Sequence, residues 1–118
     1  MDISDTKKFL PLPPASFHIL LSLAAGERHG YAIIQDVHER TGGEVKLGPG
    51  TLYRTLQNLL SKGLIEEVRD RQLGSIGDPR RRPYGITELG SAVARAEAAR
   101  LANLVELART AGLNPEPA

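Results

Sequence analysis

Apolar side chains recur at helical spacing in four stretches of the chain, and glycine or proline residues separate these stretches. We predict helices over residues 14–25, 31–41, 49–62 and 88–111. Each ends immediately before a glycine, which suits the left-handed backbone at a helix C-terminus. The fourth follows Thr87, whose hydroxyl group is a favourable N-terminal cap.

The segments around these helices are rich in turn-forming residues. Residues 1–13 contain two prolines, and we interpret them as an arm because proline disfavours a continuous helix. Strand-like segments at 64–68 and 82–86 flank a polar stretch with glycine and proline, which predicts a hairpin with a long loop. Residues 113–118 contain two further prolines and are expected to form a flexible tail.

The order of these elements predicts a mainly α fold with a small β-hairpin. Residues 14–86 fit a winged helix-turn-helix DNA-binding domain, in which a third helix with a polar face directly precedes the hairpin. The last helix lies within residues 87–112, and about 24 helical residues extend about 36 Å. This length is more than a three-helix core covers, so we infer that a partner covers the rest and interpret the segment as a dimerisation helix.

The composition is that of one ordinary globular domain. The 118 residues are 41% hydrophobic and 25% charged, which is enough for one compact core and too little for two. The chain lacks an apolar run of about eighteen residues, and its start lacks the apolar centre of a secretory signal. The absence of cysteine excludes disulfides, thiolate zinc sites and cysteine nucleophiles. We therefore expect a cytoplasmic protein that does not bind a membrane.

Basic charge is concentrated in the middle of the chain. Residues 46–82 hold eight basic and four acidic side chains, a net charge of +4, whereas the whole chain has a net charge of +1. Such a concentration is typical of a surface that binds a polyanion, although a solvated basic loop has the same composition.

The predicted third helix has one face of leucines and another face of side chains that form hydrogen bonds. Arginine can pair with guanine, glutamine and asparagine can pair with adenine, and threonine and tyrosine can contact phosphate groups. Lysines near both helix ends suit phosphate groups, and the helix start exposes backbone N–H groups. We therefore predict DNA contacts by Lys46, Gly50, Thr51, Tyr53, Arg54, Gln57, Asn58 and Lys62. The alternative is an ordinary solvated face, with Tyr53 packed beneath the hairpin.

Three consecutive arginines, Arg80, Arg81 and Arg82, stand where the hairpin begins its second strand. Guanidinium groups can hold the DNA backbone or enter a narrow minor groove, so we predict DNA contacts for all three. Alternatively, Arg82 pairs with Glu66 or Glu67 across the hairpin and shapes the wing without touching DNA.

The sequence His29-Gly30-Tyr31 suggests a metal or catalytic site, because histidine is a common ligand and base. The three histidines of the chain lack the spacing of a known metal motif, and no cysteine accompanies them. We expect no metal and no cofactor: His29 caps or orients the second helix, Gly30 permits a close approach, and Tyr31 anchors the core. Because no phosphate-binding loop, nucleophile elbow or catalytic triad is visible, we do not expect an enzyme.

Four short blocks follow one another along the chain: His29-Gly30-Tyr31, Gly-Thr-Leu-Tyr at 50–53, residues 59–65 and residues 82–90. Together they resemble the successive signature blocks of PadR-family transcriptional regulators, and the similarity covers residues 15–100. The resemblance implies a dimer built by the C-terminal helix, repression from a palindromic operator and, in many members, a small-molecule or stress signal that lowers DNA affinity. A single C-terminal helix is similar to the short subgroup of the family.

We hypothesise that a small hydrophobic effector binds between the two C-terminal helices and the first helix of the partner. Its pocket would be lined by Phe17, Leu101, Leu104 and Val105. The chain has no tryptophan and few other aromatic residues, so its surface for stacking planar ligands is small. The leading hypothesis is a homodimeric, sequence-specific DNA-binding repressor that reads a palindromic operator. The alternative is a winged-helix module that binds another protein and lacks specific DNA binding.

Overall fold

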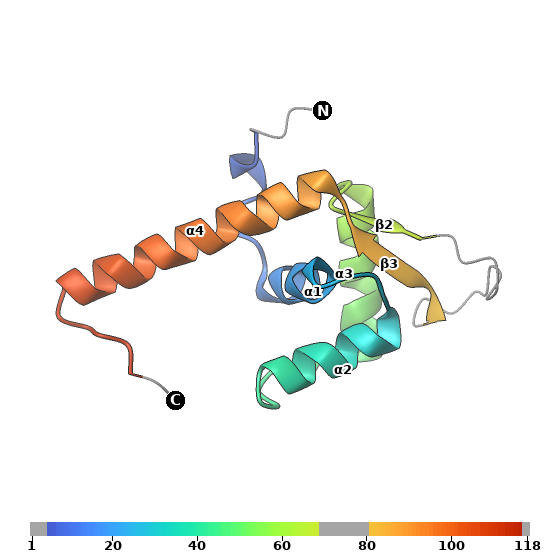
Figure 1. Cartoon of the computed structure of the whole chain (residues 1–118), viewed down its shortest axis with the longest axis horizontal. Helices are drawn as coiled ribbons and strands as arrows, with labels where there is room; N and C mark the ends of the chain where they lie inside the picture. Colours follow the sequence, from blue (N-terminus) through green and yellow to red (C-terminus); the bar gives the residue numbers. More distant parts are fainter. Residues whose placement is uncertain (1–4, 69–80, 117–118) are drawn as a thin grey trace.

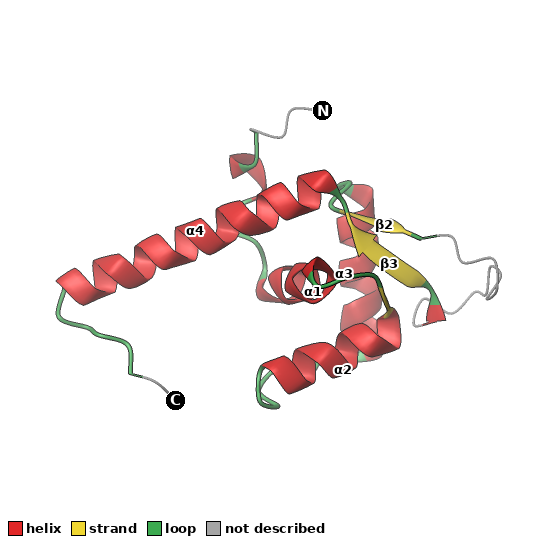
Figure 2. Ribbon diagram, in the orientation of Figure 1, coloured by secondary structure: helices red, strands yellow, loops and turns green. Residues whose placement is uncertain are grey.

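Four α-helices and a small antiparallel sheet form the part of the chain that the computed structural model describes, residues 5–68 and 81–116 (Figure 1). In chain order the elements are the 3-10 helix η1 (Lys7–Phe9), α1 (Pro14–Ala24), β1 (Arg28–His29), α2 (Gly30–Arg40), α3 (Pro49–Ser61), β2 (Ile65–Glu67), β3 (Pro83–Ile86) and α4 (Glu88–Thr110). The α-helices agree with the predicted ones to within one residue at each end. The mainly α, winged helix-turn-helix architecture is confirmed (Figure 2).

The sheet has the strand order β1–β3–β2, and both strand pairs are antiparallel. Ile65 lies opposite Ile86 in the predicted hairpin, and Arg28 lies opposite Tyr84 on the other side of β3. β1 is absent from the predicted elements, because two residues are too few to show an alternating pattern. The packing of the chain against β3 is what makes them a strand.

Helix α1 lies at the centre of the domain and packs against α2, α3, α4 and β3 (Figure 1). Its side chains Ile19, Leu20 and Leu23 are fully buried. Around them lie the equally buried side chains Ile33, Val37, Leu52, Leu56, Leu59 and Tyr84. Since each surrounding helix buries one face against α1, its other face is left for solvent or a ligand.

The segment before α1 packs against α4. η1 contacts α4, and the side chain of Leu12 is only 8% exposed. The backbone N–H of Leu12 donates a hydrogen bond to Glu97 Oε2 across 3.3 Å. Phe9 and Leu10 are partly buried against the same core. The described part of the arm is therefore a packed edge of the domain.

Helix α4 begins at a double contact of Thr87. The Thr87 hydroxyl donates to the carbonyl oxygen of Gly63 over 2.6 Å and accepts from the backbone N–H of Gly90 over 3.0 Å. The N-terminal part of α4 packs on the core, whereas residues 101–110 project beyond it (Figure 1). Within residues 5–68 and 81–116, no helix combines the length and the apolar character that a membrane span requires.

Candidate nucleic-acid interface

Helix α3 has a buried leucine face and an exposed polar face. Leu52, Leu56 and Leu59 are at most 1% exposed. The opposite face consists of the exposed side chains Tyr53, Arg54, Gln57 and Asn58. Tyr53 is 48% exposed, so it is not packed beneath the hairpin as the alternative interpretation supposed. No acidic residue occurs from position 45 to position 65, so this face is polar without negative charge.

The first turn of α3 is open to a ligand. Its N-cap is Gly48, no side chain caps its N–H groups, and no acidic residue lies in this turn. A Cβ atom added at Gly50 would have no neighbour within 4 Å. Lys46 before the helix and Lys62 at its C-cap are both exposed. Thr51, in the same turn, is half-buried. Backbone N–H groups and flanking lysines suit a phosphate group.

The strands β2 and β3 form the hairpin, or wing, and β2 packs against α3. Arg81 is exposed, whereas Arg82 is half-buried and its Nη1 lies 3.7 Å from Glu67 Oε2. This ion pair across the hairpin is the alternative role expected for Arg82. Arg80 lies outside the described residues. Among the described residues, Arg81 is therefore the arginine of this run whose side chain is exposed.

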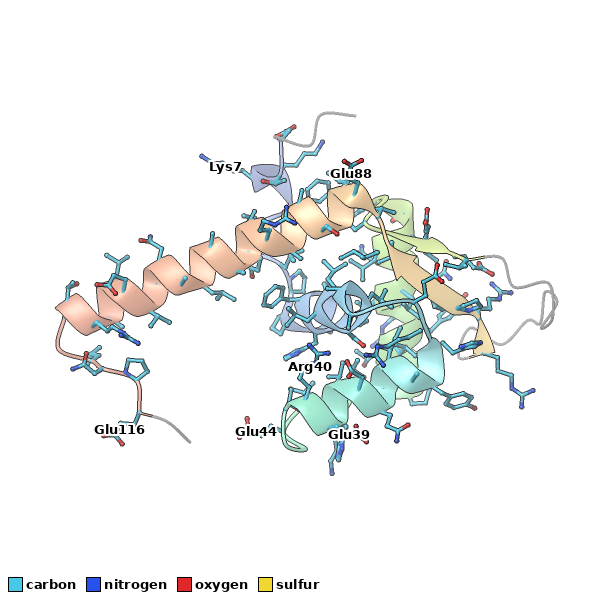
Figure 3. All side chains as sticks on the ribbon, viewed as in Figure 1. Lys7, Glu39, Arg40, Glu44, Glu88 and Glu116 are labelled. Atoms are coloured by element: carbon cyan, nitrogen blue, oxygen red, sulfur yellow. The ribbon has the colours of Figure 1, made fainter. Side chains whose placement is uncertain are left out.

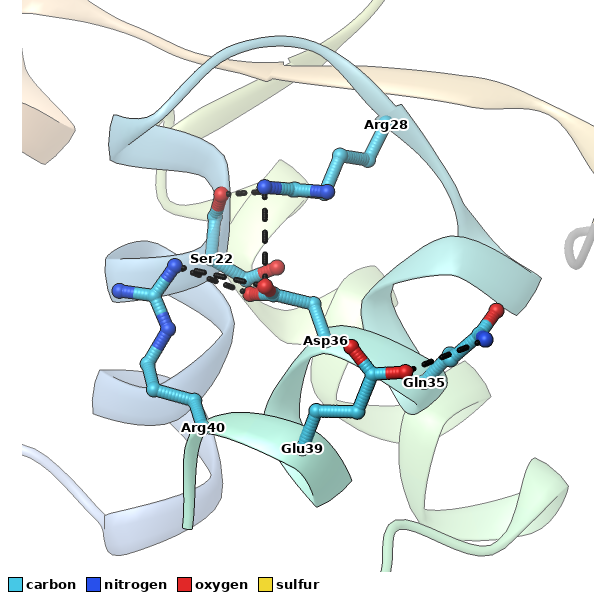
Figure 4. A network of polar contacts seen from close by, with 6 residues as sticks. All are labelled: Ser22, Arg28, Gln35, Asp36, Glu39 and Arg40. Atoms are coloured by element: carbon cyan, nitrogen blue, oxygen red, sulfur yellow. Dashed lines mark hydrogen bonds and ion pairs between the residues drawn. The ribbon is translucent and has the colours of Figure 1, made fainter. Parts of the chain in front are cut away.

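A network of a hydrogen bond and ion pairs joins α1, β1 and α2 (Figure 4). Arg28 Nε donates to the carbonyl oxygen of Ser22 over 3.1 Å, and Arg28 Nη2 lies 3.6 Å from Asp36 Oδ1. Arg40 Nη2 lies 3.2 Å from Asp36 Oδ2. Burial by itself raises the pKa of Asp36, but the Ser22 hydroxyl and the two guanidinium groups outweigh it and lower that pKa. A charged Asp36 thus ties the strand beside β3 to α2.

The prediction that Tyr31, in the His29-Gly30-Tyr31 segment, anchors the core is wrong. Gly30 is buried, as a close approach requires, but Tyr31 is 49% exposed and does not anchor the core. The buried stripe of α2 includes Ile33, and Tyr31 lies two positions earlier, on the opposite side of the helix. The His29 side chain makes no capping hydrogen bond. Among the described residues, no group of three or more acidic or histidine side chains is arranged to hold a metal ion.

The residues expected to line an effector pocket do not lie on one packed surface of the chain. Phe17 is partly buried against the core from α1. Leu101, Leu104 and Val105 are 36%, 47% and 41% exposed on the projecting part of α4. These three aliphatic side chains therefore face solvent in a single chain.

Comparison with known proteins places the chain among relatives of different lengths. It is 33% identical over 90 residues to an uncharacterized 37.1 kDa protein in a transposon of Streptomyces fradiae. This match covers 76% of the chain but spans only about a quarter (24%) of the relative.

Solved structures share the fold. A PadR family transcription regulator from Clostridium difficile matches with a TM-score of 0.67 and 26% identity, over 80% of this chain and 94% of that one. The PcaV transcriptional regulator of Streptomyces coelicolor, solved with its natural ligand, matches with a TM-score of 0.61 and 25% identity. That match covers 83% of this chain and 61% of PcaV.

The family model described as the transcriptional regulator PadR-like family matches residues 19–96, which run from α1 into α4. This match covers more than half of the chain, and the family consists of transcriptional regulators, not enzymes. The protein therefore belongs to the PadR-like family of transcriptional regulators.

Proposed function

We propose that the protein is a sequence-specific DNA-binding repressor that reads a palindromic operator as a homodimer. The observation that supports this proposal best is the exposed, acid-free polar face of α3, whose first turn has no side-chain cap. The exposed Arg81 belongs to the hairpin that follows α3. In this arrangement α3 enters the major groove, where Arg54, Gln57 and Asn58 read base edges. The lysines at the ends of α3 and the wing arginines hold the DNA backbone.

The dimer is proposed from the apolar face of α4. Buried positions Leu89, Val93 and Glu97 follow one another at four-residue spacing, and Leu101 continues the same row. The row thus passes from the core into the projecting part of the helix, where Leu104 and its aliphatic neighbours are exposed. A second copy that packs against this face removes the apolar surface from water and places two α3 helices on one DNA duplex.

The same face would hold a small hydrophobic effector between the two subunits. In the proposed dimer, Leu101, Leu104 and Val105 of one subunit lie near Phe17 in α1 of the other subunit. The structure of the related PcaV with its natural ligand supports a ligand-responsive regulator. A ligand that binds one arrangement of the two subunits better than another shifts the spacing of the α3 helices and lowers DNA affinity.

The experiment is a titration of the purified protein against the promoter region of its own gene, at two salt concentrations, with a scrambled duplex as competitor. We expect tight binding that weakens with salt, because phosphate contacts release counterions, and that survives the competitor. Arg54→Ala should weaken operator binding by about 5-fold to 150-fold, the usual value of one bidentate base contact.

The matched control is Arg95→Ala, since Arg95 is an exposed arginine on α4, outside the proposed DNA surface. Its operator affinity should remain that of the wild type. Equally weak binding of the wild type to both duplexes, confirmed by a selection of bound genomic fragments that yields no common sequence, would contradict specific DNA binding. That result would favour the protein-interaction module.

A further inference from the structure

The first turn of α2 brings an exposed aromatic side chain beside the wing. Tyr31 follows β1 by two residues, and in β1 His29 lies directly opposite Pro83 of β3. Pro83 comes directly after Arg81 and Arg82. The N-terminal end of α2 therefore lies beside the outer end of β3, as Figure 1 shows. Tyr31 is therefore held close to the start of β3, although Arg81, two residues before that strand, is fifty positions from Tyr31 in the sequence.

The position of Tyr31 is rigid. Gly30 is buried before it, and Ile33, one turn further, is fully buried in the core. Asp36 of the same helix pairs with Arg28 of β1 across 3.6 Å, which fixes α2 against the sheet. A contact made by a side chain on such a fixed element costs little ordering entropy.

Among the residues that the structure describes, the charges around the first turn of α2 suit an anion. No acidic residue lies in that turn. The carboxylate of Asp36 is already paired with two arginines. Glu39 and Glu44 lie at the opposite end of α2, as Figure 3 shows. Glu27 lies against Gly85 of β3.

We propose that Tyr31 is a further DNA-contacting residue, whose hydroxyl group donates a hydrogen bond to a backbone phosphate beside the groove that α3 occupies. This inference rests on the proposed function. A tyrosine hydroxyl is a donor that contacts phosphate oxygens in protein–DNA complexes, and its ring adds contact area on the sugar. With α3 and Arg81, Tyr31 gives the domain a third contact that fixes its orientation on the duplex.

The test is Tyr31→Phe, which removes only the hydroxyl oxygen. We expect operator affinity to fall about 3-fold to 10-fold, the net value of one typical hydrogen bond. Affinity for a scrambled duplex should fall by the same factor, because a phosphate contact contains no sequence information. The salt dependence should stay that of the wild type, because tyrosine is neutral, whereas Arg81→Ala should reduce the slope by about one.

Gln35→Ala is the matched control, since Gln35 is exposed one turn further along the same face of α2. Its DNA affinity and the thermal unfolding of both variants should equal those of the wild type. If Tyr31→Phe binds the operator as tightly as the wild type while Arg54→Ala binds it more weakly, the Tyr31 contact is overturned and the proposed function stands. If Tyr31→Phe loses affinity for the operator but not for the scrambled duplex, a phosphate contact is overturned. If Gln35→Ala loses as much affinity as Tyr31→Phe, a contact specific to Tyr31 is overturned. Failure of the wild type to bind any DNA would overturn both proposals.

Discussion

Glu97 and Arg100 form a two-pronged ion pair within one turn of α4, although Glu97 is only 2% exposed. Arg100 Nε lies 2.6 Å from Glu97 Oε1, and Arg100 Nη2 lies 3.0 Å from Glu97 Oε2. The same carboxylate accepts the hydrogen bond of the Leu12 N–H. A buried carboxylate is tolerated when such partners replace its water. The pair fastens the segment before α1 to α4 at the point where α4 leaves the core.

The ionisation of Glu97 makes the stability of the fold depend on pH. The hydrogen bond from Arg100 lowers the pKa of Glu97, against the opposing effect of burial, below its ordinary value of 4.5. Because the folded pKa lies below the unfolded one, the ionised group stabilises the fold above the unfolded value and loses this contribution as pH falls through the folded value. Glu97→Gln should therefore lower the free energy of unfolding by about 1–3 kcal/mol at neutral pH. The loss relative to wild type should shrink in acid, as urea unfolding at several pH values will measure.

The control for this prediction is Glu106→Gln, which changes an exposed acid on the same helix. It should unfold like the wild type at each pH. An unchanged free energy of unfolding in Glu97→Gln would show that the buried ion pair contributes no net stability.

Two glycines should respond to alanine in opposite ways. Gly90 packs so closely on Leu64 that an added Cβ would collide with the backbone carbonyl oxygen of Leu64. Gly90→Ala should destabilise the protein by about 1–3 kcal/mol or more, because the first turn of α4 must move away from the Leu64 backbone, which directly precedes β2. A Cβ atom at position 50 meets open space, so Gly50→Ala should raise the free energy of unfolding by up to about 1 kcal/mol. A stable Gly90→Ala would disprove the tight contact.

Gly50→Ala also tests the DNA surface independently of folding. A methyl group at this position stands where a phosphate would approach the first turn of α3. Operator affinity should fall while stability rises, which binding titrations and thermal unfolding of one preparation will measure. Unchanged affinity would remove the start of α3 from the proposed interface.

The proposed dimer makes a further prediction at Leu104. This side chain is 47% exposed in one chain, and in the proposed dimer the partner covers it. Leu104→Glu should yield a monomer by sedimentation equilibrium and weaken operator binding, since each monomer then reads a single half-site. Leu113→Glu is the control, because Leu113 lies after α4 and is 70% exposed. A Leu104→Glu variant that dimerises like the wild type would place the interface elsewhere.

The helices and the faces of α3 follow from local information. Leucines at 52, 56 and 59 stand three and four positions apart, so a helix places them on one side and Arg54, Gln57 and Asn58 on the other. Glycines after each helix and Thr87 before α4 act within one turn of the chain. For this reason the order of the four α-helices and the hairpin, and the polar face of α3, were predictable from the amino-acid pattern.

Tertiary packing decided the rest, because it depends on contacts between residues far apart in the chain. Arg28 and His29 form a strand only because β3 lies beside them. Glu97 has the sequence appearance of an ordinary surface acid, yet Arg100 and the distant Leu12 N–H make it a buried one. The apolar spacing of α2 allows Tyr31 in the core, but α1 covers the side of the helix that contains Ile33 and leaves Tyr31 exposed beside the wing.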